Sequence, residues 1–141
     1  MKPAEVRFSV GADILGLGKL LGGLRPDTTY PGDPGTTLHK QVRPPCASAT
    51  PRTKDPNWIP LVTQQGLLIL TRDANIQQHH AELDAVRANQ ARTVALSSRD
   101  ATSTWSQLEV VMCQWREIEK LTEQPGPFIY TATRTSLAKV L

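Results

Sequence analysis

Three aspartates fall at places in the sequence where carboxylates could gather around a cation. Asp13 closely follows the apolar run 6–10, and Asp73 closely follows the apolar run 67–70, while Asp55 starts a further expected helix. Each run is typical of a buried parallel strand that leads into a helix, so these aspartates are expected at the carboxyl edge of one sheet. Open α/β sheets bind their ligands at that edge. Carboxylates brought together there repel one another, and a hard cation such as Mg²⁺ or Mn²⁺ is the usual way to hold them.

The same three aspartates also fit a purely structural role. Each precedes an expected helix, and aspartate is among the preferred N-cap residues. Asp55 fits this role best, because Pro56 would occupy the first helical position. The two roles are compatible, since helices that follow parallel strands point their N-termini at the carboxyl edge, where their dipoles favour a bound phosphate. Three aspartates at one edge favour a metal site with Asp13, Asp55 and Asp73 as ligands and catalytic residues.

Other polar residues give weaker signals. Among the remaining aspartates, Asp33 and Asp100 are expected to come nearest to the site. His79 and His80 are adjacent on an expected helix, where successive side chains diverge by about 100°, so they cannot hold one ion together. No catalytic role is assigned to them.

The elements that position these residues alternate between strands and helices. Besides the two apolar runs, we expect strands over residues 28–30, 92–96 and 128–131, and helices over residues 14–24, 54–65, 74–90 and 104–122. Right-handed crossovers turn this order into a three-layer α/β/α sandwich with a mainly parallel central sheet.

The longest expected helix carries one apolar face. That face could serve the core, a dimer or both, and the tryptophans on it and in the preceding helices are expected to be structural. Its residues are Trp105, Leu108, Val111, Met112, Trp115, Ile118 and Leu121.

The length of 141 residues predicts a single domain, residues 1–141. Eight of the eleven prolines lie between residues 26 and 60. Because proline interrupts regular structure, we expect a functional or mobile loop at about residues 31–53. Scattered basic residues in and around that loop favour a nucleic-acid partner only slightly.

Charge and cysteine content bear on the kind of partner and on the cellular compartment. The net charge of +3 and the pI of about 9.1 suit a polyanionic partner without requiring one. The two cysteines, Cys46 and Cys113, form no metal-binding or disulfide pattern, so a reducing cytoplasm is the simplest setting. The chain shows no signal-type or membrane-spanning apolar stretch, and we expect a soluble protein with no membrane partner.

Four segments resemble those of a known family. The strand ending near Asp13 and the stretches KDPNWIP, LLILTRD and GPFIYTATRT are similar to PIN-like domains of the VapC-type toxin ribonucleases, from residue 6 to about residue 135. The resemblance implies an α/β/α sandwich that binds Mg²⁺ or Mn²⁺ through clustered carboxylates, cuts RNA and is restrained by a cognate antitoxin protein. It also gives Asp55 and Asp73 the acidic positions at the helix start and after the strand, and Asp13 the third place of the first-strand motif.

Gly11 departs from the pattern of that family. Related sequences carry an aspartate at this first place of the motif, whereas glycine can ligate a metal only through its carbonyl. Loss of one carboxylate weakens the binding of a hard cation and the orientation of the attacking water. The glycine therefore predicts a weakened or inactive nuclease. If it is an inactivating substitution that allows a toxic protein to be produced, Gly11→Asp should raise RNA cleavage.

The leading hypothesis is thus a toxin-type, metal-dependent endoribonuclease. Its first rival is a non-catalytic module that binds RNA or an antitoxin on the same fold, which Gly11 favours. A phospho-acceptor receiver domain is a second rival, although the paired acids expected after its first strand are missing. A haloacid-dehalogenase-type phosphotransferase would need a nucleophilic aspartate at position 11, which glycine argues against.

Overall fold

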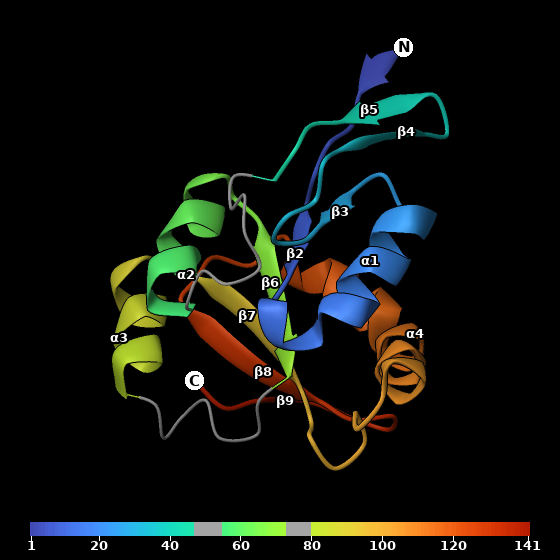
Figure 1. Cartoon of the computed structure of the whole chain (residues 1–141). Coiled ribbons are helices and arrows are strands. Elements are labelled where there is room, and N and C mark those ends of the chain that lie inside the picture. The colour runs from blue at the N-terminus through green and yellow to red at the C-terminus, as the bar shows by residue number, and fades with distance from the viewer. Residues whose placement is uncertain (47–54, 73–79) are drawn as a thin grey trace.

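The computed structural model of the chain describes residues 1–46, 55–72 and 80–141, without the side chains of residues 55–57 and 80–82. In these residues the chain forms an α/β fold around a six-stranded sheet with the strand order β3-β2-β6-β7-β8-β9 (Figure 1). The first five of these strands run parallel, and the last pair is antiparallel. The strands are β2 (Phe8–Val10), β3 (Thr28–Thr29), β6 (Leu68–Arg72), β7 (Arg92–Leu96), β8 (Phe128–Ala132) and β9 (Leu137–Lys139).

Helices cover both faces of this sheet. A short 3-10 turn, η1 (Ala12–Ile14), leads from β2 into α1 (Leu15–Leu24), which lies with α4 (Thr104–Leu121) on one face. The opposite face carries α2 (Asp55–Gln64) and α3 (His80–Ala88) (Figure 1). The predicted three-layer α/β/α sandwich with a mainly parallel sheet is confirmed.

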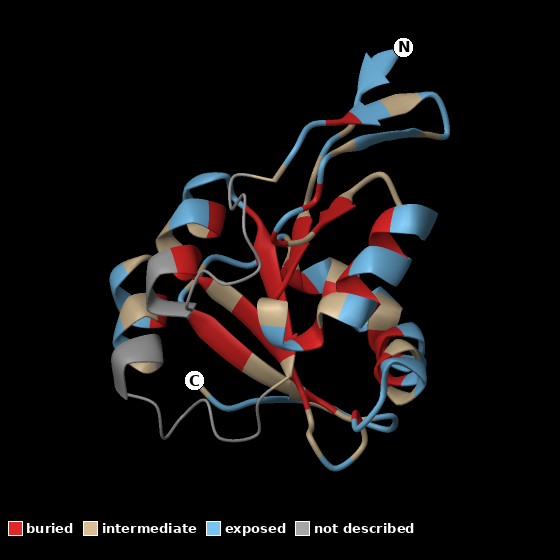
Figure 2. Ribbon diagram, in the orientation of Figure 1, coloured by how far each residue is buried: buried red, intermediate tan, exposed pale blue. Residues whose placement is uncertain are grey.

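The core consists of two apolar layers separated by the sheet, and the central strands are buried on both faces (Figure 2). Phe8, Leu68 and Leu70 face the layer under α1 and α4, whereas Ile69 and Ile129 face the layer under α2 and α3. Successive side chains of a strand point to opposite faces. This explains why the strands read as continuous apolar runs rather than as alternating patterns.

Two glycines of α1 allow the helix to approach the sheet edge closely. A Cβ at Gly18 would lie 2.8 Å from Cβ of Tyr30 and 3.3 Å from Cβ of Val10. A Cβ at Gly22 would lie 2.8 Å from a ring carbon of Tyr30. The glycines lower the helix propensity of this segment, but here they make room for a tyrosine packed against the helix.

The ends of α2 and α4 follow the signals in the sequence. Gly66, two residues beyond α2, has a φ of +74°, the left-handed conformation that glycine adopts without strain. At α4, the Ser103 hydroxyl accepts a hydrogen bond of 3.1 Å from the backbone N–H of Ser106. This is an N-cap contact, which satisfies one of the free donors of the first helical turn.

The expected apolar face of α4 is wrong at two positions. Trp105 is 78% exposed and Met112 is 69% exposed, so both lie on the outer side of the helix. Val110 and Gln114 occupy the buried side in their place. Apolar residues occur around more than half of this helix, so the 3.6-residue period alone could not assign the buried stripe.

A small second sheet projects from the body of the molecule (Figure 1). It has the order β1-β5-β4 and is formed by β1 (Lys2–Pro3), β4 (Thr36–Leu38) and β5 (Gln41–Arg43). The expected proline-rich loop at about residues 31–53 thus contains a β-hairpin, while residues 47–53 lie outside the described residues. His39 and Lys40 form its turn, with φ values of 51° and 61°. Positive φ at both central residues is typical of a type I′ hairpin, which glycine or asparagine would have signalled more clearly.

A buried ion pair ties the hairpin to the body. The guanidinium of Arg43 donates from Nε to Oδ2 of Asp33 at 2.7 Å, and their side chains are only 2% and 1% exposed. Nη1 of Arg43 also donates to the carbonyls of Gly22 and Arg25 near the end of α1. The expectation that Asp33 approaches the carboxyl-edge site is therefore wrong, because this carboxylate neutralises a buried arginine instead.

Breaking this ion pair should destabilise the protein strongly. Arg43→Gln leaves the Asp33 carboxylate buried without a cation, so we expect the free energy of unfolding to fall by about 3–5 kcal/mol. Urea unfolding followed by circular dichroism measures the loss. Lys120→Gln, which removes an exposed ion pair with Glu117, is the control and should cost less than about 0.5 kcal/mol. Equal losses in the two variants would contradict a structural role of the buried pair.

Candidate functional site at the carboxyl edge of the sheet

Asp13 lies where two strands end side by side. The backbone N–H of Gly11 donates to the carbonyl of Leu70 at 2.7 Å and so extends the pairing of β2 with β6 by one residue. Oδ2 of Asp13 then accepts two hydrogen bonds of 2.8 Å, one from the Thr71 hydroxyl and one from the backbone N–H of Arg72. Asp13 does not cap a helix, since Gly11 precedes η1 and Ile14 precedes α1 at the two N-cap positions. Its carboxylate instead joins the carboxyl ends of β2 and β6.

Gly11 provides the space in which this carboxylate lies. A Cβ on Gly11 would come within 2.5 Å of Oδ1 of Asp13, which is closer than real Cβ contacts. The backbone of Gly11 is extended, with φ −69° and ψ 158°, so the backbone itself would accept any residue. An aspartate at position 11 would therefore have to displace the Asp13 carboxylate. This geometry argues against a simple gain of activity in Gly11→Asp, although that expectation stays untested.

The other two predicted ligands are placed less completely. Asp55 is the first residue of α2 rather than the expected N-cap before it, and its side chain is outside the part that the structure describes. Asp73 follows Arg72 directly in the sequence and lies outside the described residues. Of the two histidines considered above, His79 is also outside them, and His80 begins α3.

Arginines lie at or just beyond the carboxyl ends of three neighbouring parallel strands. Arg72 ends β6, Arg99 follows β7 and Arg134 follows β8, and the last two are exposed. We call these three residues the basic rim. The basic residues of the proline-rich loop gave the only basic signal considered in the sequence, so the basic rim was not predicted. The signal was present in the sequence, because an arginine comes within three residues of the end of each of the apolar runs 67–70, 92–96 and 128–132.

Asp100, as expected, lies near this edge and is engaged by the basic rim. Its Oδ2 accepts a hydrogen bond of 3.0 Å from the backbone N–H of Arg134, whose Nη2 is 3.6 Å from Oδ1. Nη1 of Arg134 donates to Glu109 at 2.9 Å. The hydrogen bond with Glu109, followed by the nearby charge of Asp100, raises the pKa of Arg134. This arginine is therefore a permanent positive charge at the exposed edge.

Residues 35–98 match the family model described as a PIN like domain. The match covers less than half of the chain, from the residue before β4 to shortly after β7. No curated protein and no solved structure matches the chain.

The PIN-like segment, residues 35–98, contains two of the three predicted ligands, Asp55 and Asp73. Asp13 lies outside the segment in sequence, but its carboxylate is hydrogen-bonded to Thr71 and Arg72 within it. PIN-like domains commonly carry nuclease activity. The narrower resemblance to VapC-type toxins stays a prediction.

The residues around Asp13 fit a hard cation only in part. The Asp13 carboxylate and the Thr71 hydroxyl are oxygen donors of the kind that Mg²⁺ and Mn²⁺ accept. Among the side chains that the structure describes, however, no three from histidine, cysteine, aspartate or glutamate come together to hold an ion. One carboxylate and one hydroxyl do not make a strong site. A metal would need the carboxylates of Asp55 and Asp73 as well.

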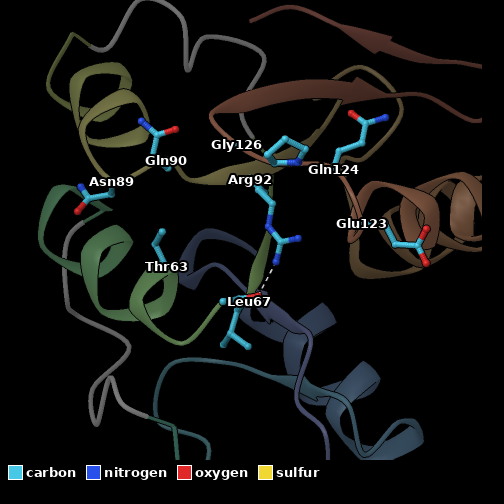
Figure 3. Close-up of a pocket in the computed structure, with 10 residues that line it drawn as sticks. Thr63, Leu67, Asn89, Gln90, Arg92, Glu123, Gln124 and Gly126 are labelled. Carbon is cyan, nitrogen blue, oxygen red and sulfur yellow. Dashed lines mark hydrogen bonds between the residues drawn. The ribbon is translucent and has the colours of Figure 1, made fainter.

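A separate hollow lies at the opposite, amino edge of the six-stranded sheet (Figure 3). It measures about 480 Å³, and Asn89, Gln90 and Gln124 are among the residues that line it. Arg92 donates hydrogen bonds there to the carbonyls of Thr122 and Gly66, and burial lowers the pKa of this arginine. Asp13, the one predicted ligand whose side chain the structure describes, does not line this hollow, so the hollow is distinct from the site around Asp13.

No helix in the described part of the chain combines the length and apolar character needed to cross a membrane.

The close approach of Gly11 and Asp13 predicts energetic coupling between them. Gly11→Ala should lower the free energy of unfolding by about 0.5–1.5 kcal/mol, because its Cβ pushes the exposed Asp13 carboxylate away from Thr71 and breaks their hydrogen bond. In the Gly11→Ala, Asp13→Ala double variant the methyl group introduced at position 11 has room. The losses of the two single variants should therefore sum to more than the loss measured for the double variant. Urea unfolding of the two single variants and the double variant measures this coupling. Strictly additive losses would show that the two residues do not contend for the same space.

Proposed function

We propose that the protein is a metal-dependent endoribonuclease of the PIN-like kind, acting at the carboxyl edge of the sheet. The observation that carries the proposal is the position of Asp13, whose exposed carboxylate is fixed at the joined ends of β2 and β6. It is bonded to the residue that directly precedes Asp73 within the PIN-like segment. A carboxylate exposed at this edge and held in one orientation is suited to bind a ligand.

In this proposal, Asp13, Asp55 and Asp73 hold Mg²⁺ or Mn²⁺. The cation, when bound, activates water for attack on a phosphodiester and offsets the charge of the leaving oxygen. Thr71 and the backbone of Arg72 keep the Asp13 carboxylate in a fixed orientation. The basic rim binds the phosphates of the RNA on either side of the bond that is cut.

The toxin role and the antitoxin partner rest on the resemblance described above. A toxin-type ribonuclease needs a cognate antitoxin protein because uncontrolled RNA cleavage stops growth. Slower growth of cells that express the chain, relieved by Asp13→Asn, would support this part of the proposal.

Gly11 favours one alternative, a non-catalytic module that binds RNA or an antitoxin on the same fold. The glycine removes a carboxylate that related sequences carry, while the basic rim would still attract a polyanion. Such a module would bind RNA with an affinity that does not depend on Mg²⁺ or Mn²⁺, and it would leave the RNA intact.

Asp13→Asn tests the proposed chemistry. The amide has nearly the shape of the carboxylate but no charge, so we expect cleavage of a labelled RNA with Mn²⁺ to fall on the order of 100-fold. Asp84→Asn, on the exposed side of α3, is the matched control and should leave cleavage unchanged. Thermal unfolding of both variants checks that they remain folded.

The outcome separates the two functions. Cleavage by the wild-type chain that is lost in Asp13→Asn and retained in Asp84→Asn supports the nuclease. Cleavage that persists in Asp13→Asn would remove this residue from the site. RNA binding without cleavage by the wild-type chain would favour the binding module.

The basic rim makes a second prediction, about the salt dependence of RNA binding. Each arginine that neutralises a phosphate of single-stranded RNA contributes about 0.7 to the slope of log affinity against log salt. Replacing Arg72, Arg99 and Arg134 together by glutamine should therefore lower that slope by about 1.4 to 2, the lower value applying if Arg134 keeps Asp100 and Glu109 as its partners. Fluorescence anisotropy of a labelled RNA measures this slope, with every variant made in the Asp13→Asn background. Arg87→Gln, in the last turn of α3 near the amino edge, is the control, and an equal effect there would exclude the rim as the RNA contact.

A further inference from the structure

An apolar surface on α1 and α4 remains exposed after the chain has folded. Trp105 and Met112 on α4 are 78% and 69% exposed, and Leu24 at the end of α1 is 57% exposed. Beside them a hollow of about 490 Å³ lies between the two helices and is lined largely by Leu24, Leu108, Met112 and Trp115. Large apolar side chains gathered in this way mark an interaction surface more often than an ordinary exterior. We call the surface formed by Leu24, Trp105, Leu108, Met112 and Trp115 the α1/α4 face.

Charged residues of both signs flank this face at a fixed spacing. Glu109 and Arg116 are seven residues apart on α4, which is about two helical turns, so they lie on one side of the helix. Met112 and the neighbouring Cys113 lie midway between them in the sequence. Trp105 and Met112 share the same seven-residue spacing, so apolar and charged residues form two adjacent stripes along the exposed side.

This charge pattern is complementary to itself when two helices run in opposite directions. In an antiparallel pair centred near Met112, Glu109 of each copy lies beside Arg116 of the other, and the contact is made twice. In a parallel pair, Glu109 would meet Glu109 and Arg116 would meet Arg116, which is repulsive. A partner with charge of a single sign would also be repelled by one of the two residues.

We propose that the α1/α4 face binds a second copy of this chain, with the two α4 helices antiparallel about a two-fold axis near Met112. Isologous pairing of this type is the commonest symmetry of soluble oligomers. The Met112 side chain of each copy enters the hollow beside Leu24 and Trp115 of the other. Arg25, which stacks 4.5 Å above the Trp115 ring, fixes one wall of that hollow.

Glu109 can take part in such a pair without breaking a costly contact. Its present partner is Arg134, at 2.9 Å, and the two side chains are 47% and 51% exposed. An exposed pair of this kind contributes little free energy. A carboxylate can also accept hydrogen bonds from two guanidinium groups at once.

The first test is the molar mass of the full-length chain in solution, by size-exclusion chromatography with light scattering. We expect twice the 15.5 kDa of one chain for the wild type, and a single chain for Met112→Asp. Glu117→Asp, an exposed position on the same helix outside the face, should remain dimeric. A wild-type monomer at every concentration measured would overturn the proposal.

Charge reversal tests the antiparallel arrangement itself. Glu109→Arg and Arg116→Glu should each weaken the dimer about tenfold or more in dissociation constant, because each places like charges together twice. The double variant exchanges the two charges and should restore association. Failure of the double variant to recover, while it stays folded by circular dichroism, would overturn the antiparallel pairing.

Cross-linking supplies a geometric test. With both natural cysteines changed to serine, Met112→Cys should form a disulfide-linked dimer under mild oxidation, whereas Glu117→Cys should not. Equal cross-linking at both positions would indicate random collision and would contradict a defined axis. None of these measurements depends on RNA cleavage, so they test the dimer independently of the proposed nuclease.

Discussion

The parallel pairing of β2 with β6 places Val10 beside Leu70, so that two strands distant in sequence end at the same point. The carboxylate of Asp13 can reach Thr71 and the backbone of Arg72 only because of this register. A shift by one residue would turn Phe8 and Val10 away from the layer under α1 and α4. The polar side chain of Ser9 would face that layer instead. The apolar packing of the sheet therefore also fixes the position of the candidate site.

Much of the fold could be predicted because its signals are local. Continuous apolar runs mark the central strands, and Gly66 marks the end of α2. The projecting hairpin could not be found in the same way, since His39 and Lys40 adopt positive φ without being glycine or asparagine. Strand β9 was missed because its three residues gain their regular structure from pairing with β8, a contact that depends on tertiary structure.

The candidate site was predictable in its location but not in its contacts. An aspartate after an apolar run indicates the carboxyl edge, and Asp13 lies there. Its hydrogen-bond partners come from a strand far along the chain, so no local pattern could name Thr71 or explain the room that Gly11 provides. Asp33 was misjudged for the same reason, because its partner Arg43 becomes apparent only after the hairpin folds back on α1.

The two outer strands of the main sheet have a consequence for how the molecule meets other proteins. At one edge β3 is only two residues long, and Thr28 and Thr29 are both buried. At the other, β9 reverses direction, spans three residues and ends in the charged Lys139. Short, covered or charged edges are how proteins prevent a foreign strand from adding to a sheet. The edges of this sheet therefore disfavour the addition of an extended peptide or amyloid-like stacking. We expect other molecules to bind through the side chains of the helices and of the carboxyl edge.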